Sequence, residues 1–213
     1  MKENNFFKRL ISSPFLSKLS LGKRAAFIAM FAAISVISNL ILEIRIFDIQ
    51  FSLTIMISGL IGIMLGPVWG LTSCIIGDLA GYFLNSWGQL YMPWVGLSTG
   101  MFAFIAGLIF MNRSKSLTAL LIRTAIFTAT TFLICTAGIN SLGFYLYNKN
   151  AGFSTAVIDY VSQKFGGERV TFLFYLVYRL IFKGQIFNSL FNYAMLFLLL
   201  PVLRRVKLFE NYI

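Results

Sequence analysis

Residues 50–86 decide the fold of this chain, and they read QFSLTIMISGLIGIMLGPVWGLTSCIIGDLAGYFLNS. Apolar side chains fill the stretch on both sides of Gly66-Pro67, and Asp78 is its one charged residue. A bilayer core needs about 20 mostly apolar residues per helix, and a Gly-Pro pair stops a helix and favours a tight turn. The stretch therefore predicts two membrane-spanning helices, over 50–65 and 68–86, that are joined at Gly66-Pro67.

The rest of the chain has the same apolar character. Of its 213 residues, 58% are hydrophobic and 12% are charged, and the mean hydropathy is +0.82. Soluble domains carry about 25% charged residues, so this composition excludes a soluble enzyme and a disordered chain. It predicts an all-α integral membrane protein with one transmembrane substrate-binding domain over residues 1–213. The predicted spans are six helices, over 24–43, 50–65, 68–86, 94–111, 117–146 and 178–203.

The basic residues predict how these helices are oriented. Lys and Arg concentrate in the cytoplasmic segments of membrane proteins. If the basic N-terminal segment 1–23 is cytoplasmic, the external segments hold Arg45, Lys149, Lys164 and Arg169. The cytoplasmic segments and their flanks then hold twelve basic residues, which are Lys2, Lys8, Arg9, Lys18, Lys23, Arg24, Arg113, Lys115, Arg123, Arg204, Arg205 and Lys207. We therefore expect both termini in the cytoplasm and explain the net charge of +11 by the bilayer, without a nucleic-acid partner.

Several kinds of chemistry are missing from the sequence. It has no histidine and no Gly-x4-Gly-Lys-Ser/Thr phosphate loop, which removes the usual zinc and haem ligands, a Ser-His nucleophile and ATP hydrolysis by that route. Cys74 and Cys135 lie in apolar runs and are interpreted as packing residues. We expect this chain to bind no metal and no cofactor.

Charged side chains inside spans are costly in lipid and are therefore functional candidates. Asp78 is the single acid away from the ends of the predicted spans, and either a ligand or a structural partner such as Arg179 or Lys183 satisfies it. Arg179 and Lys183 are four residues apart and share one face of the predicted last helix. Two cations that open to the outer side would attract an anionic solute, and Arg binds carboxylates in a bidentate manner.

Two connections and one helix face add further candidates. The turn at 85–94 contains Asn85, Trp87, Tyr91 and Trp94, which suit either anchoring at the membrane interface or the grip on a flat aromatic ligand. The polar connection 148–170 is long enough to predict a functional loop. In the first span, small side chains recur at every fourth position and let another helix approach, within the bundle or from a partner. These residues are Ala25, Ala29 and Ala33.

These features together resemble the substrate-binding S component of energy-coupling factor (ECF) vitamin transporters. The resemblance runs from Lys23 to Arg205, and the alanine run resembles the first-helix motif by which this family docks on its transmembrane T component. Within the family, the chain is most similar to the folate-type branch. The stretches that carry this similarity are 57–70, 77–81, 91–94, 138–142 and 178–183, together with Pro201.

The resemblance implies a transport mechanism in a bacterial or archaeal plasma membrane. The chain would bind a vitamin, with folate or a related carboxylated compound as the best match, at the external side. The T component and two cytoplasmic ATPases, which use ATP, would then drive delivery to the inside. The implied ligand contacts are a carboxylate at Arg179 and Arg45, ring stacking by Trp87, Tyr91 and Trp94, and amide bonds from Asn85 and Asn140.

Three alternatives stay open from the sequence. The cargo of an S component can be another vitamin or a small metabolite. An intramembrane enzyme would need a dyad, for which Asp78 with Lys183 or Tyr82 are the available residues. A structural membrane subunit would bind no ligand at all.

Overall fold

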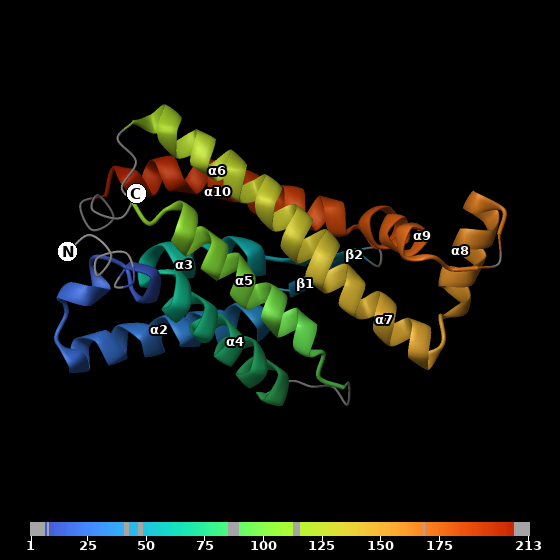
Figure 1. Cartoon of the computed structure of the whole chain (residues 1–213), viewed down its shortest axis with the longest axis horizontal. Coiled ribbons are helices and arrows are strands. Elements are labelled where there is room, and N and C mark those ends of the chain that lie inside the picture. The colour runs from blue at the N-terminus through green and yellow to red at the C-terminus, as the bar shows by residue number, and fades with distance from the viewer. Residues whose placement is uncertain are drawn as a thin grey trace.

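The computed structural model describes residues 7, 9–40, 43–46, 49–84, 90–112, 116–167 and 169–206, and the side chains of 43–46, 49 and 50 lie outside this description. The described part is a bundle of helices with one β-hairpin (Figure 1). Its elements in chain order are η1 (Leu16–Lys18), α2 (Leu21–Leu40), β1 (Glu43–Ile46), β2 (Ile49–Ser52), α3 (Thr54–Leu65), α4 (Pro67–Leu84), α5 (Pro93–Ile109), α6 (Leu117–Thr131), η2 (Phe132–Asn140), α7 (Ser141–Ala151), α8 (Thr155–Phe165), α9 (Phe172–Val177), η3 (Tyr178–Phe182) and α10 (Gln185–Arg204).

Each of the six predicted spans overlaps a helix of the structure. Four helices are long and apolar enough to cross a membrane, and they are Leu21–Leu40, Pro67–Leu84, Leu117–Ala151 and Gln185–Arg204. Helices α3 and α5 are also apolar but shorter, with 12 and 17 residues. The tight turn predicted at Gly66-Pro67 is present, because α3 ends at Leu65 and α4 begins at Pro67.

The β-hairpin is an element that the sequence interpretation missed. Strands β1 and β2 pair antiparallel, with Arg45 opposite Gln50. Apolar and polar residues alternate through 43–52, which is the period of a strand rather than of a helix. The predicted second span is therefore wrong at its start, since 49–52 form β2 and the helix begins only at Thr54. The fold class is helical, with this hairpin as its exception.

One long helix replaces the predicted fifth span. Residues Leu117–Ala151 form a continuous helix of 35 residues, which at 1.5 Å per residue extends roughly 50 Å and exceeds the ~30 Å hydrocarbon core. The π-helical segment η2 lies within this helix, between α6 and α7. The α7 end projects away from the rest of the bundle (Figure 1).

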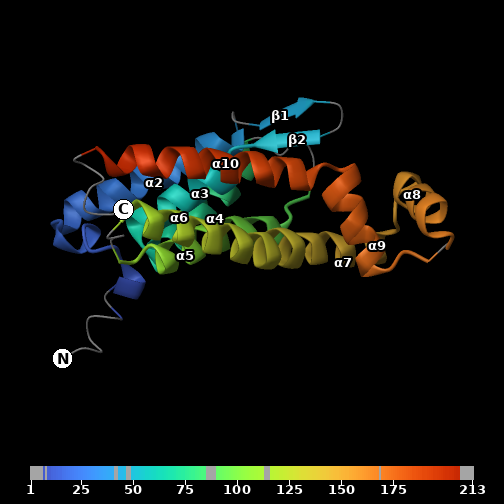
Figure 2. The ribbon, with the colours of Figure 1, turned by 90° about the horizontal axis from the view of Figure 1, so that it is seen from above.

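The predicted last span, 178–203, is two helices in the structure. Helix α9 continues into the π-helical segment η3, which ends at Phe182, and α10 begins at Gln185. Gly184 lies between them with φ of 68°, a left-handed conformation that side chains other than glycine rarely adopt. Figure 2 shows α9 set at an angle to α10. The connection predicted at 148–170 is mostly the helix α8, whose Val157 packs against α9 and η3.

The main hydrophobic core lies between α3, α5, α6 and α10. Its members include Met56, Phe102, Phe127 and Leu196, and a buried hydrogen bond of 3.0 Å joins the hydroxyls of Thr131 and Tyr193 across α6 and α10. The two cysteines are free and buried. Helix α2 begins and helix α10 ends at the same end of the bundle, opposite α8 and α9 (Figures 1 and 2).

Candidate ligand-binding site

The first cluster of candidate residues surrounds Trp94, at the start of α5. Its indole ring lies against Gly143 of α7, where a Cβ atom would collide with the ring. The rings of Phe144 and Tyr147 flank it, with centroids 5.6 and 5.9 Å away. The indole Nε1 is buried and finds no hydrogen-bond partner among the described residues. Since a buried donor without a partner costs about 1–3 kcal/mol, this position is suited to a ligand that carries an acceptor.

Arg179 belongs to the same cluster and is buried, with 8% of its surface exposed. Its guanidinium carbon lies 4.1 Å from the centroid of the Phe144 ring, and its Nη1 donates to the backbone carbonyl of Asn140 at 3.4 Å. The hydroxyl of Tyr175 is a third hydrogen-bond partner. An aromatic ring, a carbonyl and a neutral phenol do not neutralise the charge. A buried cation without an anion is costly, and an anionic ligand would supply the missing charge.

Two π-helical segments bring Arg179 and Asn140 together. Asn140 is the last residue of η2, and Arg179 lies in η3. The side-chain Oδ1 of Asn140 is buried and also lacks a partner among the described residues. π-helical turns often occur at functional sites. The cluster thus combines a cation, a free acceptor on Asn140 and a free donor on Trp94, and we call these three residues the Arg179 cluster.

Asp78 and Tyr91 form a second pair at the beginning of α5. The Tyr91 hydroxyl donates to the Asp78 carboxylate at 3.2 Å, and the Tyr91 ring lies 5.1 Å from the ring of Tyr82. Burial, with a contribution from the neighbouring carboxylate, raises the pKa of Tyr91 to about 12. The hydroxyl therefore stays a donor at physiological pH.

The structure does not pair Asp78 with Arg179 or Lys183, as one open alternative required. Asp78 bonds Tyr91, Arg179 lies on Phe144, and Lys183 is exposed. The shared face of Arg179 and Lys183 stays a prediction, and the structure has Arg179 buried and Lys183, the capping residue of η3, exposed. Apolar residues resume on both sides of Lys183-Gly184-Gln185, so hydropathy alone does not mark the end of this helix.

Three candidate ligand contacts cannot be compared with the geometry of the cluster. Arg45 lies in β1, but its side chain is outside the described ones. Asn85 and Trp87 fall within 85–89, outside the described residues. These three residues stay predictions.

Helix α2 carries the predicted docking face. Ala25, Ala29 and Ala33 are all exposed, while Ser35 and Ser38 are the buried residues of this helix. The alternative that the alanine face packs inside the bundle is therefore wrong for this chain.

A further pair, Asn188 and Asn192 of α10, holds the hairpin in place. Asn188 Oδ1 accepts from the Ser52 amide at 2.9 Å, and Asn192 Nδ2 donates to the Ser52 carbonyl at 2.6 Å. Asn192 Oδ1 also accepts from the Met56 amide at 3.0 Å, in the first turn of α3. The spacing of these asparagines shows that they share a helix face, but their partners lie 136 positions or more away in the chain.

The described residues contain no group of three or more Cys, Asp or Glu side chains that could hold a metal ion. What the Arg179 cluster offers is recognition: charge, stacking surface, one donor and one acceptor.

Comparison with known proteins gives two findings. The sequence model of the family described as "ECF transporter, substrate-specific component" matches residues 23–204. A solved structure, described as the crystal structure of FolT bound with folic acid, is similar with a TM-score of 0.51 and 21% sequence identity. The match covers 83% of this chain and 92% of that chain, and it shows a shared fold. No curated protein matches.

Proposed function

This chain belongs to the family of ECF transporter substrate-specific components, and we propose that it binds folate or a related carboxylated vitamin at the end of the bundle that contains Arg179. The family consists of membrane proteins that bind the substrate of a transporter, not of enzymes. The observation that carries the proposal is the buried Arg179, whose described partners are a ring, a carbonyl and the Tyr175 hydroxyl, none of them an anion. A carboxylate would complete its shell, and the indole N–H of Trp94 and the amide oxygen of Asn140 would bond a ring that has both an acceptor and a donor.

The similar fold of FolT, which binds folic acid, supports folate as the first ligand to test. Folic acid combines carboxylates with a flat heterocycle that carries donors and acceptors, which is the chemistry that the Arg179 cluster offers. Arg45, Asn85, Trp87 and Tyr91 are further proposed contacts, and Asp78 would act by holding the Tyr91 hydroxyl.

The test is calorimetric titration of folic acid into the purified chain. We expect R179Q to weaken binding by about 100-fold, because loss of one partner of a buried charged pair costs about 2–5 kcal/mol. The matched control is R169Q, since Arg169 is exposed, and it should bind like the unchanged chain. Equal affinities of R179Q and R169Q would contradict the proposed site.

We also propose that α2 docks on the T component through Ala25, Ala29 and Ala33, so that two cytoplasmic ATPases can drive delivery. The proposed orientation has six spans and both termini in the cytoplasm of a bacterial or archaeal cell. The basic residues at the end where α2 begins and α10 ends, and the exposure of the alanine face, support it.

Substitution A29W tests the docking face. We expect it to abolish vitamin uptake by the complete transporter while the purified chain binds folic acid as before. The matched control is A125W, which places the same bulk at an exposed alanine of α6 and should leave uptake intact. Loss of uptake and of binding together in A29W, or of neither, would contradict docking through this face.

A further inference from the structure

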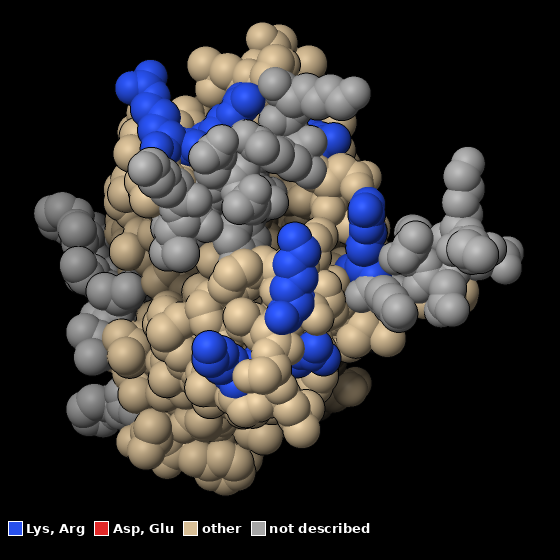
Figure 3. All heavy atoms as spheres, turned by 90° about the vertical axis from the view of Figure 1, so that its left-hand side faces the viewer, with Lys and Arg blue, Asp and Glu red and all other residues tan. Residues whose placement is uncertain are grey.

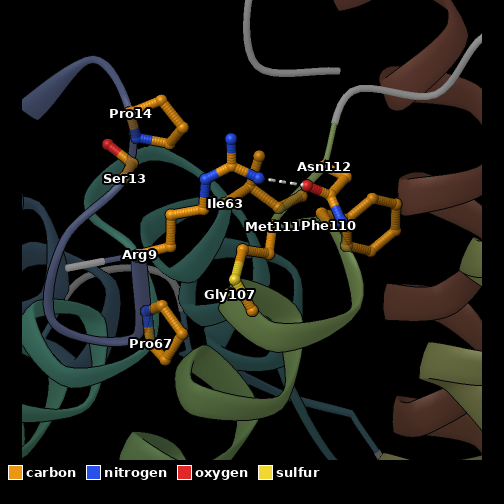
Figure 4. Close-up of a pocket in the computed structure, with 10 residues that line it drawn as sticks. Arg9, Ser13, Pro14, Ile63, Pro67, Gly107, Phe110, Met111 and Asn112 are labelled. Atoms are coloured by element: carbon orange, nitrogen blue, oxygen red, sulfur yellow. Dashed lines mark hydrogen bonds between the residues drawn. The ribbon is translucent and has the colours of Figure 1, made fainter. Parts of the chain in front are cut away.

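A cavity of about 210 Å³ lies at the opposite end of the bundle from the Arg179 cluster. Its walls come from the N-terminal segment, the turn between α3 and α4, and the end of α5. Figure 4 shows Arg9 hydrogen-bonded to Asn112 among the residues that line it. No part of the proposed vitamin transport uses this cavity.

The N-terminal segment is held firmly in the position that forms one wall. The Ser13 amide donates to the carbonyl of Leu65 at 2.9 Å, and Leu16 is completely buried. Arg24 bonds the carbonyls of Leu16, Ser17 and Leu19 at 3.2, 3.1 and 3.4 Å. The helical residues 9–11 end before Pro14, and the short helix η1 follows at Leu16–Lys18. The cavity is thus part of the packed structure.

Arg9 supplies the charge of the cavity. Its Nη1 donates to Asn112 Oδ1 at 2.7 Å, and Arg123 donates to the backbone carbonyl of the same asparagine. A guanidinium has five N–H donors in a planar fork that matches phosphate oxygens, and the bond to Asn112 uses one of those on Arg9. Two guanidinium groups therefore converge beside one cavity.

The surroundings favour an anion at this end. In Figure 3, which faces it, the coloured side chains of the described residues are all Lys or Arg. The described basic residues of the N-terminal segment and of the helix ends nearest to it in the fold are Arg9, Lys18, Lys23, Arg24, Arg123, Arg204 and Arg205. Such a surface attracts anionic lipid, with about 1 kcal/mol per basic residue.

The other face of the cavity is apolar. Ile63 and Phe110 are buried, with 6% and 4% exposed, and Met111 lies next to them. A small inorganic anion needs no such lining, whereas an amphiphile presents apolar carbon atoms next to its charged group. The cavity also lies where α5 ends, which in a membrane protein is the level of the headgroups.

We propose that this cavity binds the phosphodiester headgroup of an anionic phospholipid, with Arg9 on the phosphate and Ile63, Phe110 and Met111 against the glycerol and the first acyl carbons. The site anchors the N-terminal segment to the bilayer and is separate from the vitamin site.

The experiment measures the thermal unfolding of the purified full chain in mild detergent against the concentration of dioctanoyl phosphatidylglycerol. The comparison ligands are dioctanoyl phosphatidylcholine and inorganic phosphate. Binding to the folded state raises the midpoint temperature in a saturable way. We expect phosphatidylglycerol to raise it, and phosphatidylcholine and inorganic phosphate to have less than a tenth of the apparent affinity.

Variants locate the effect. R9Q should weaken phosphatidylglycerol binding about tenfold, and the matched control K18Q, which removes an exposed charge at the same end and does not line the cavity, should change it less than twofold. M111W keeps every charge but fills the cavity, so it should also weaken phosphatidylglycerol binding. If R9Q does not fold, M111W tests the site in its place.

Three results would overturn the site. The first is an equal response to phosphatidylcholine. The second is an equal response to inorganic phosphate, which would mean that the cavity binds a free anion and not a lipid headgroup. The third is an equal loss in R9Q and K18Q together with unchanged binding in M111W, which would mean diffuse surface charge.

Discussion

Arg9 and Arg24, at the end of the bundle where α2 begins and α10 ends, bond an amide oxygen and backbone carbonyls near the surface, whereas Arg179, at the other end, is buried against the ring of Phe144. The first two hold a segment of chain in place. The third is bonded to a ring, a carbonyl and the Tyr175 hydroxyl, and none of these is an anion. The comparison teaches that the burial and partners of a cation, rather than the net charge of +11, indicate where the vitamin would bind.

The largest expected effect is a loss of stability at the basic end that leaves ligand binding at the other end unchanged. Leu16 is completely buried against Ile61 and Leu65, so L16A removes a core side chain and leaves a cavity. We expect a loss of about 3 kcal/mol in the free energy of unfolding, measured in detergent, with folic acid affinity unchanged. The matched control is L21A, at a leucine that is 82% exposed. A drop in ligand affinity with L16A would break the separation of the two ends.

A smaller effect is expected where α10 holds the hairpin. N192A leaves the Ser52 carbonyl and the Met56 amide without their partner, so we expect a loss of about 2 kcal/mol in stability. Amide hydrogen exchange in residues 49–56 should become faster, as a direct readout of the hairpin. N150A, at an exposed asparagine of α7, serves as the control, and equal exchange in both variants would show that Asn192 does not position the hairpin.

The smallest expected effect is on ligand affinity, and it tests whether Lys183 binds the ligand as its spacing from Arg179 predicts. Lys183 is exposed beyond the end of η3, so K183Q should change folic acid affinity less than twofold, in contrast to R179Q. Calorimetric titration under the same conditions provides the comparison. If K183Q weakens binding as much as R179Q does, the two residues act as the cation pair that the spacing predicts.

Much of the helical framework could be predicted from the sequence, because long apolar runs have few alternatives in a bilayer. The turn at Gly66-Pro67 followed from local chemistry alone. The break at Gly184 could not be predicted, since glycine is also common inside membrane helices and apolar residues resume on both sides of Lys183-Gly184-Gln185. The helix that contains Arg179 therefore has a different direction from the one expected.

The candidate site was predictable in its residue types but not in its contacts. Arg179 stood out as a cation in an apolar span, Trp94 as an aromatic residue of the turn at 85–94, and Asn140 through the family resemblance alone. The structure brings the three together. Two π-helical turns do this, and such turns depend on packing between distant segments rather than on local propensity. The partner of Asp78 could not be predicted from the sequence either. Its partner is the neutral Tyr91 hydroxyl, whereas charge alone favours Arg179 or Lys183.

The most direct test of the central claim is mass spectrometry of the small molecules that stay bound to the unchanged chain after gentle purification in detergent. The account predicts a carboxylated vitamin with a flat conjugated ring, folate first, present in the unchanged chain and R169Q and lost in R179Q. A bound compound without a carboxylate, or one retained equally by R179Q, would contradict the claim that Arg179 binds the substrate.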